Sequence, residues 1–305
     1  MKKILPFIFY FTLLLSYGQV QIQVLTGTEQ GTYFQLGNDM NELLPKNIMV
    51  KNEDSVEVSF LDIRSTAGSS LNLELLADKN NSAKVAIMQL DILLLKKMDD
   101  LLNETHFTDD LMVLMPLNVE QIHLVTKETS KISSLESLSG TKVAIGNKQE
   151  GTYFTATYIQ NLSKVNWISK NISTQDVIKP LLLDKIDAFF MVATPPMDML
   201  KLLPVSSGAK YKLVSIENMN GWANPYIPTT ITAGTYNWQK SDVSTFGVPS
   251  VVVVNMAKIS DEEKQLLLQW KALIIENLEE LKANGHPAWK TATLSDWNTS
   301  IWPSL

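Results

Sequence analysis

The 305-residue chain contains no cysteine, only three histidines and a single arginine. The lack of cysteine excludes disulfides, a thiol nucleophile and a cysteine-based metal site within this chain. His106, His123 and His286 are scattered without the spacing of metal ligands, so we interpret each as a surface or strand residue. With no nucleophilic triad or metal motif in the sequence, we predict a protein that is not an enzyme and needs no cofactor.

Long basic runs are also missing, and the formal net charge is −6. This balance argues against nucleic acid as a partner, although it says nothing against a small anionic ligand. Hydrophobic residues make up 45% of the chain, which is enough for a large core arranged as one large domain or two lobes. We expect a monomer.

The N-terminus is typical of an export signal. Lys2 and Lys3 precede an apolar run over residues 4–15, and small residues follow at the cleavage-determining positions before Gln19. The run is short for a bilayer span, so a retained membrane anchor is the less favoured alternative. We therefore predict a periplasmic protein whose signal peptide, residues 1–18, is cleaved near Gly18.

One short phrase occurs twice, as EQGTYF at residues 29–34 and QEGTYF at residues 149–154. Each copy follows a short apolar run, 22–27 or 142–146, and precedes an amphipathic stretch. Because a helix start carries unpaired N–H groups and a partial positive charge, two such starts facing one space suit an anionic or carbonyl-bearing ligand. The alternative is that the glycines only make tight turns.

Strand and helix patterns alternate along the chain, which predicts an α/β fold with mixed, mostly parallel sheets. Two extended segments, 111–126 (interrupted at Pro116) and 248–255, have no intervening helix and are interpreted as crossings between lobes. We expect one lobe from residues 19–116 and 249–305, a second from 117–248, and a ligand cleft between them at the carboxyl ends of the strands. Helices are expected at 33–44, 71–77, 91–103, 133–138, 152–162, 173–184, 197–203 and after a capping box at 260–263. Strands are expected at 56–63, 85–88, 142–145, 187–192 and 211–216. Residues 218–244 are expected to form a long ordered loop.

Several loop motifs resemble those of one known family. Thr26-Gly27 with residues 31–37 resembles its opening TG…GxYYPLG motif, and residues 65–73 resemble STGGSxxNL. Met88-Gln89 with Asp91 resembles the family's VQxD motif, and Pro116-Leu117 with residues 123–125 resembles PLYxExVHLV. Residues 138–151 resemble LKGKRVAVGxxGSG, and residues 233–236 resemble AGTY. In order and spacing the chain resembles the TAXI-type solute receptors of TRAP transporters, within the type II periplasmic binding protein fold. Gln149-Glu150 departs from the family's small residues and brings a carboxylate toward the expected cleft.

The resemblance implies an exported receptor that captures a small carboxylate-bearing solute, glutamate-like or a 2-oxo acid, and delivers it to the TRAP permease subunits. One alternative is a receptor that presents its ligand to a membrane sensor. A less favoured alternative is an enzyme on the same fold that uses Glu29 with Glu150 as an acid–base pair.

Arg64 is the only arginine beside 25 lysines, and it stands where a strand ends and a cleft loop begins. Its guanidinium could hold a carboxylate through two hydrogen bonds, with a salt bridge to Asp62 as the alternative. Thr66 and Ser69 can offer hydroxyls, or can simply cap the following helix. Tyr33 and Tyr153 are candidate cleft walls. The full set of expected ligand-binding residues is Thr28, Gly31, Thr32, Tyr33, Arg64, Thr66, Ser69, Gln89, Thr152, Tyr153 and Thr194.

Overall fold

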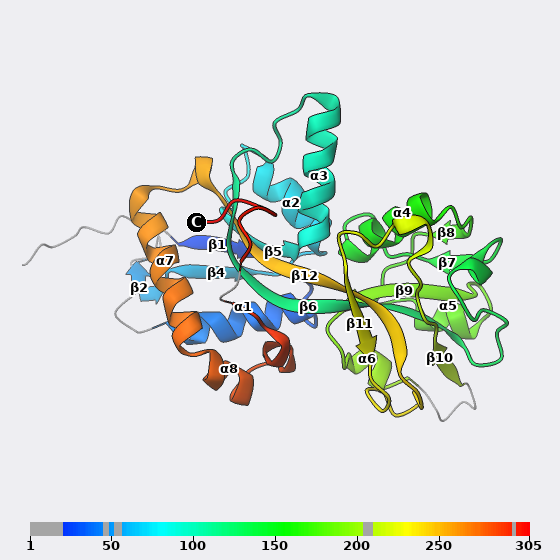
Figure 1. The fold of residues 1–305 in the computed structure, drawn as a ribbon. Helices are drawn as coiled ribbons and strands as arrows, with labels where there is room; N and C mark the ends of the chain where they lie inside the picture. Colours follow the sequence, from blue (N-terminus) through cyan, green and yellow to red (C-terminus); the bar gives the residue numbers. More distant parts are fainter. Residues whose placement is uncertain (1–20, 45–48, 52–56, 204–209, 295–296) are drawn as a thin grey trace, which may run out of the picture.

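The computed structural model describes residues 21–44, 49–51, 57–203, 210–294 and 297–305 (Figure 1). The expected signal peptide lies outside the described residues. In the part of the chain that is described, no helix is long and apolar enough to cross a membrane.

A ten-stranded mixed sheet runs through the molecule in the order β4-β1-β5-β12-β6-β9-β7-β8, with β10 added to β6 and β11 to β12. The strands at its two ends are parallel, whereas the central pairs are antiparallel. A separate antiparallel pair joins β2 to β3. The strands are β1 Ile22–Leu25, β2 Met49–Lys51, β3 Glu57–Ser59, β4 Leu61–Arg64, β5 Val85–Gln89, β6 Leu111–Lys127, β7 Lys142–Ala144, β8 Ile168–Lys170, β9 Ala188–Ala193, β10 Tyr211–Leu213, β11 Ile227–Ile231 and β12 Val243–Asn255.

Helices follow the parallel strands, as the alternating sequence pattern predicts. They are α1 Thr32–Glu42, α2 Ser69–Ala77, α3 Leu90–Asn103, α4 Gly151–Ser163, α5 Ile178–Leu182, α6 Asp198–Lys201, α7 Asp261–Glu276 and α8 Leu278–Asn284. The starts of α1, α2 and α4 each follow a loop at the carboxyl end of a strand, which is where ligands bind in such sheets.

Strands β6 and β12 span the molecule side by side (Figure 1). They are 17 and 13 residues long, against a usual strand length of about five to six. Pro116 does not interrupt β6. It pairs with Val251 next to a register shift, where the ladder can accommodate a residue without an N–H donor.

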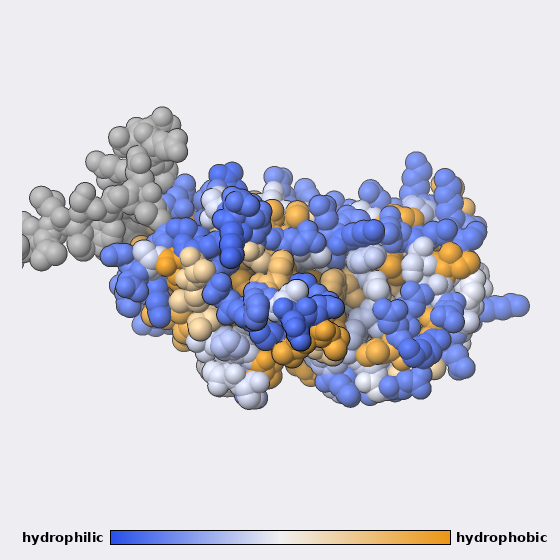
Figure 2. Space-filling model, turned by 90° about the horizontal axis from the view of Figure 1, so that it is seen from above, coloured by the Kyte–Doolittle hydropathy of each residue, from blue (hydrophilic) through white to orange (hydrophobic). Residues whose placement is uncertain are grey.

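The buried apolar side chains form separate clusters on the two sides of the molecule. Two clusters draw their residues from 22–117 and 251–302, and we call that part the first half. Two others draw on residues 122–248, the second half. The expected lobe boundaries at 116/117 and 248/249 stay predictions. The face of the molecule in Figure 2 is mostly hydrophilic, with apolar residues showing in patches.

Several predicted elements differ in extent from the structure. The strand expected at 56–63 is divided into β3 and β4, which belong to different sheets. The helix expected at 173–184 is reduced to α5, and the residues after Ser173 form a turn instead, closed by a bond from the Asp176 N–H to the Ser173 carbonyl (2.9 Å). The helix expected at 133–138 is a three-residue 3₁₀ turn over Glu136–Leu138. The segment 218–244, expected as a loop, contains β11, which pairs with the start of β12. The segment is rich in Asn, Gly and Pro, which are uncommon in strands, so its sequence did not indicate this short strand.

The C-terminal region packs on the first half. The predicted capping box is confirmed, because Ser260 Oγ accepts from the Glu263 N–H (3.2 Å) and the Glu263 carboxylate accepts from the Ser260 N–H (2.9 Å). Behind it, Trp270 is fully buried and donates from Nε1 to the Met40 carbonyl (3.2 Å). Trp289 donates from Nε1 to Asp39 (2.7 Å).

Replacing Trp270 with alanine should leave a large cavity between α1 and α7. Loss of a fully buried aromatic side chain of this kind costs about 3–5 kcal/mol of unfolding free energy. Urea denaturation followed by far-UV circular dichroism measures it. The exposed neighbour Gln269 supplies the control, since Gln269→Ala should change stability by less than about 0.5 kcal/mol. Equal stabilities for the two variants would contradict the packing of α7 described above.

Candidate ligand-binding site

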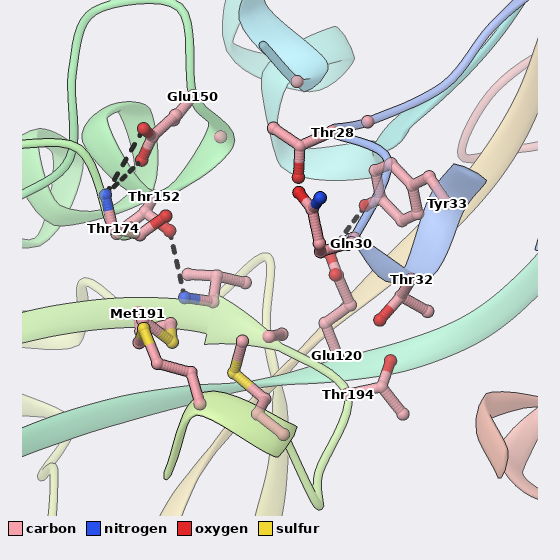
Figure 3. A pocket seen from close by; sticks show the side chains of 18 of the residues that line it. Thr28, Gln30, Thr32, Tyr33, Glu120, Glu150, Thr152, Thr174, Met191 and Thr194 are labelled. Carbon is pink, nitrogen blue, oxygen red and sulfur yellow. Dashed lines mark hydrogen bonds between the residues drawn. The ribbon is translucent and has the colours of Figure 1, made fainter. Parts of the chain in front are cut away.

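A cavity of about 480 Å³ lies between the two halves, at the starts of α1, α2 and α4 and the end of β9 (Figure 3). Its size is within the range usual for small-molecule sites. The predicted residues that line it are Thr28, Gly31, Thr32, Tyr33, Ser69, Gln89, Thr152 and Thr194. The structure thus brings residues of both GTYF loops to one space.

Three predicted site residues lie outside this lining. Arg64 has a side chain 58% exposed and donates from Nε to Asp62 (2.5 Å), two residues earlier on the same face of β4. The Thr66 hydroxyl is engaged by the Thr26 carbonyl in the loop after β1 (2.8 Å) and by Asn72 Oδ1 of α2 (2.6 Å). Tyr153 lines a second cavity beside α2 and α3. The alternative given for Arg64, a salt bridge to Asp62, describes its contact. The alternative given for Thr66, a cap on the following helix, does not apply, because no side chain caps α2.

Three threonine hydroxyls of the cavity wall have their oxygen atoms occupied by donors from the protein. Thr28 Oγ1 accepts from Gln175 Nε2 (2.9 Å), and Thr152 Oγ1 accepts from the Val192 N–H (3.0 Å). Thr194 Oγ1 accepts from Asn118 Nδ2. Among the described residues none of these hydroxyls donates to a protein acceptor. Because a hydroxyl has one proton to give, each is free to donate it to a solute.

The starts of α1 and α4 add further donors. Neither Gly31 nor Glu150, the residues that precede these helices, caps the helix with its side chain. The first N–H groups of each helix have no partner within the helix, and the helix dipole makes both starts weakly positive. Donors from the two halves therefore converge on one cavity.

Glu150 lines the cavity but its carboxylate is engaged within the second half. It accepts from the Thr174 N–H (3.1 Å), Ser173 Oγ (2.7 Å) and Asn147 Nδ2 (2.8 Å), as Figure 3 shows for Thr174. Glu29 is exposed and does not line the cavity. Glu150 thus fixes the loop before α4 in position.

Glu120 lines the same cavity and is absent from the predicted set. It lies on β6 and accepts a 2.6 Å hydrogen bond from the Tyr33 hydroxyl (Figure 3). Burial raises the pKa of Glu120 to about 8, helped by the charge of Asp91 and opposed by hydrogen bonds from Tyr33 and Gln89. A carboxylic acid in an otherwise largely apolar crossing strand was the signal that could have revealed it.

The halves are in direct contact around the cavity. Asp91 at the start of α3 accepts from Thr155 Oγ1 of α4 (2.7 Å) and from the Tyr226 hydroxyl (2.9 Å), and burial raises its pKa. The Leu71 N–H of α2 donates to the Gln149 carbonyl (3.2 Å). These bonds join the first half to the second. Tyr226, in the segment expected as a loop, takes part in these contacts and does not line the cavity.

Comparison with known proteins assigns the chain to a family. Residues 24–301 match the NMT1-like family. The chain belongs to the NMT1-like family. No curated protein matches the sequence.

Solved structures with a similar fold come from several bacteria. A Xanthomonas citri protein bound to ATP is 13% identical, with 92% of this chain and 93% of that chain covered and a TM-score of 0.55. The ligand-binding component of an ABC-type import system from Staphylococcus aureus, with zinc bound, is 10% identical over 93% and 89% of the two chains, with a TM-score of 0.52. A putative periplasmic sulfonate-binding protein from Methylobacillus flagellatus is 12% identical over 92% and 75%, with a TM-score of 0.50. At such identities the likeness concerns the fold, and the predicted periplasmic binding protein fold is confirmed.

Glu120 should make the stability of the empty protein depend on pH. Its pKa is about 8 in the folded state against an ordinary value of 4.5, so the folded state binds the proton more tightly. The protonated Glu120 side chain therefore makes its full contribution to the free energy of unfolding below about pH 4.5, and this contribution is lost as the pH rises through 8. Glu120→Gln should remove this loss and exceed the wild type by more than about 1 kcal/mol at pH 8.5, since one pKa unit corresponds to about 1.4 kcal/mol.

Urea midpoints of the solute-free proteins at pH 5 and pH 8.5 measure the effect. Glu29→Gln is the matched control, because Glu29 is exposed, and it should follow the wild type at both pH values. Parallel pH dependence in wild type and Glu120→Gln would show that Glu120 is not held in a desolvated position.

Proposed function

We propose that the protein is an exported solute-binding receptor of a membrane transporter. It takes a small carboxylate-bearing solute into the cavity between its halves and delivers it to a permease. Membership of the NMT1-like family and the periplasmic binding protein fold support the receptor role. The order of the loop motifs, which resemble those of TAXI receptors, supports a TRAP-type permease as the partner.

The observation that carries the proposal is the set of free donors around one cavity. Thr28 from the first half and Thr152 and Thr194 from the second offer hydroxyl protons, and the starts of α1 and α4 offer N–H groups. Oxygen atoms of an anion accept such bonds, and helix starts favour its negative charge. A glutamate-like or 2-oxo acid carboxylate fits this arrangement. A sulfonate would use the same donors, so the screen below includes sulfonates.

The first experiment is a thermal-shift screen of the chain from Gln19 onward against amino acids, dicarboxylates, 2-oxo acids and sulfonates. A solute that binds only the folded state at 100 times its Kd stabilises that state by about 2.7 kcal/mol, which a melting curve resolves. Calorimetry then gives the affinity of each hit.

Thr28→Val and Thr152→Val should each weaken binding of the best carboxylate roughly 10–100-fold, because a hydrogen bond to a charged group contributes about 1.5–3 kcal/mol. Calorimetry is the measurement. Thr157→Val is the matched control on α4, because Thr157 lies outside this cavity and its buried Oγ1 has no partner among the described residues. Unchanged affinity in both Thr28→Val and Thr152→Val would remove the donor set from the site.

A further inference from the structure

The part of the cavity wall that runs from the end of β9 to α6 is apolar, apart from the Thr194 hydroxyl and the exposed Asp198 side chain. We call it the methionine wall, and its members are Met191, Val192, Ala193, Pro196, Met197 and Met199. Figure 3 shows Met191 across the cavity from Thr28. A cavity of about 480 Å³ is in the range that drug-sized ligands fill, so a carboxylate bound to the hydroxyls and helix starts leaves space beside this wall.

The methionine wall is the surface of a buried apolar cluster of the second half. Met191 is a member of that cluster with 2% of its surface exposed, and Met197 and Met199 pack against it partly buried. Trp238, which packs on the same cluster, donates from Nε1 to the Leu200 carbonyl of α6 (2.7 Å) and so ties α6 to it. The backbone of the wall is thus fixed, while its unbranched thioether side chains can adjust to groups of different shape.

The described cavity wall has no unpaired cation for a second acidic group. Its basic residues are Lys201 and His286. Lys201 Nζ lies 2.9 Å from Asp198 Oδ1, so its charge is already paired. His286 Nδ1 accepts from the Ala288 N–H (3.2 Å), so this nitrogen carries no proton and the ring is neutral. Acidic side chains also line the cavity, namely those of Glu120, Glu150 and Asp198. A second carboxylate on the solute would therefore add a negative charge that these residues leave uncompensated.

We propose that the captured solute is a monocarboxylate with an apolar tail, of the branched-chain or aromatic kind. Its carboxylate binds the hydroxyls of Thr28 and Thr152 and the starts of α1 and α4, and its tail packs on the methionine wall. This inference rests on the proposed function and deepens it, because it names the part of the solute that the cavity selects. A glutamate-like or other dicarboxylic solute is then a poor ligand.

The physical basis of the selection is the contrast between the two ends of the solute. An apolar tail removes partly exposed methionine surface from water, and each methylene buried in this way should tighten binding about three- to fourfold. A carboxylate in the same place would lose its hydration and gain neither a cation nor a hydrogen-bond donor from the thioethers. Tail chemistry should therefore decide affinity among solutes that share the same carboxylate head.

Two solutes of equal size test this selection in the wild-type chain. 5-Methyl-2-oxohexanoate and 2-oxoglutarate have the same number of non-hydrogen atoms and differ only in ending with an isopropyl group or a carboxylate. Calorimetry should show the isopropyl compound binding at least about tenfold more tightly, with a more negative heat capacity change from its buried apolar surface. Equal or tighter binding of 2-oxoglutarate overturns the inference.

The double variant Met197→Gln/Met199→Gln tests whether the methionine wall carries the preference. It keeps side chains of similar length but makes the wall polar, so it should weaken 5-methyl-2-oxohexanoate at least about tenfold and the short-tailed 2-oxobutanoate only slightly. General damage to the site would weaken both solutes alike. Met98→Gln is the matched control, because Met98 lies on α3 outside the cavity with 55% of its surface exposed, and it should bind both solutes as the wild type does.

Full retention of 5-methyl-2-oxohexanoate affinity by the double variant, or equal weakening of both solutes, overturns the inference. A melting curve shows whether the variant is folded, and the comparison of the two equal-sized solutes in the wild type does not depend on it. Binding of dicarboxylates alone would overturn the inference and leave the receptor function standing. No binding of any screened solute would overturn both proposals.

Discussion

The antiparallel pairing of β6 with β12 is the constraint on which the rest of the structure depends. It joins the parallel strands of the first half to those of the second in one sheet. The two strands pack so closely that a Cβ atom on Gly247 would lie 2.6 Å from Val119 Cγ1. Because each half is fixed to this pair, the starts of α1 and α4 face the same space. Glu120, between them on β6, belongs to the connection as well as to the cavity.

The local sequence was sufficient to predict those elements whose start depends on hydrogen bonds between residues close together in the chain. The two GTYF loops predicted helices at α1 and α4, and both form. The box at Ser260 and Glu263 predicted the start of α7 for the same reason, since its hydrogen bonds span only three residues. The joining of all main strands into one sheet was not predictable in this way. It depends on pairing between segments more than a hundred residues apart, such as Val251 with Pro116.

The candidate site shows the same limit. Loops after strands were expected to meet, and most of the expected residues line one cavity. Which way a side chain turns depends on its neighbours. Arg64 had the more specific chemistry for a carboxylate, yet Asp62 beside it on the strand takes the guanidinium. Glu120 was missed because its burial and its bond with Tyr33 depend on elements from other parts of the chain. A strand pattern records burial and does not record such partners.

The first half is built from both ends of the chain, and this has a consequence for the order in which the protein can fold. Val252, Leu267 and Trp270 complete a core that begins with Ile22 and Leu36. Domains generally fold as units during synthesis. Here the amino-terminal half of the core lacks its closing layer until nearly the whole chain has been made. A chain still attached to the ribosome therefore cannot complete this core until its last segments have been synthesised.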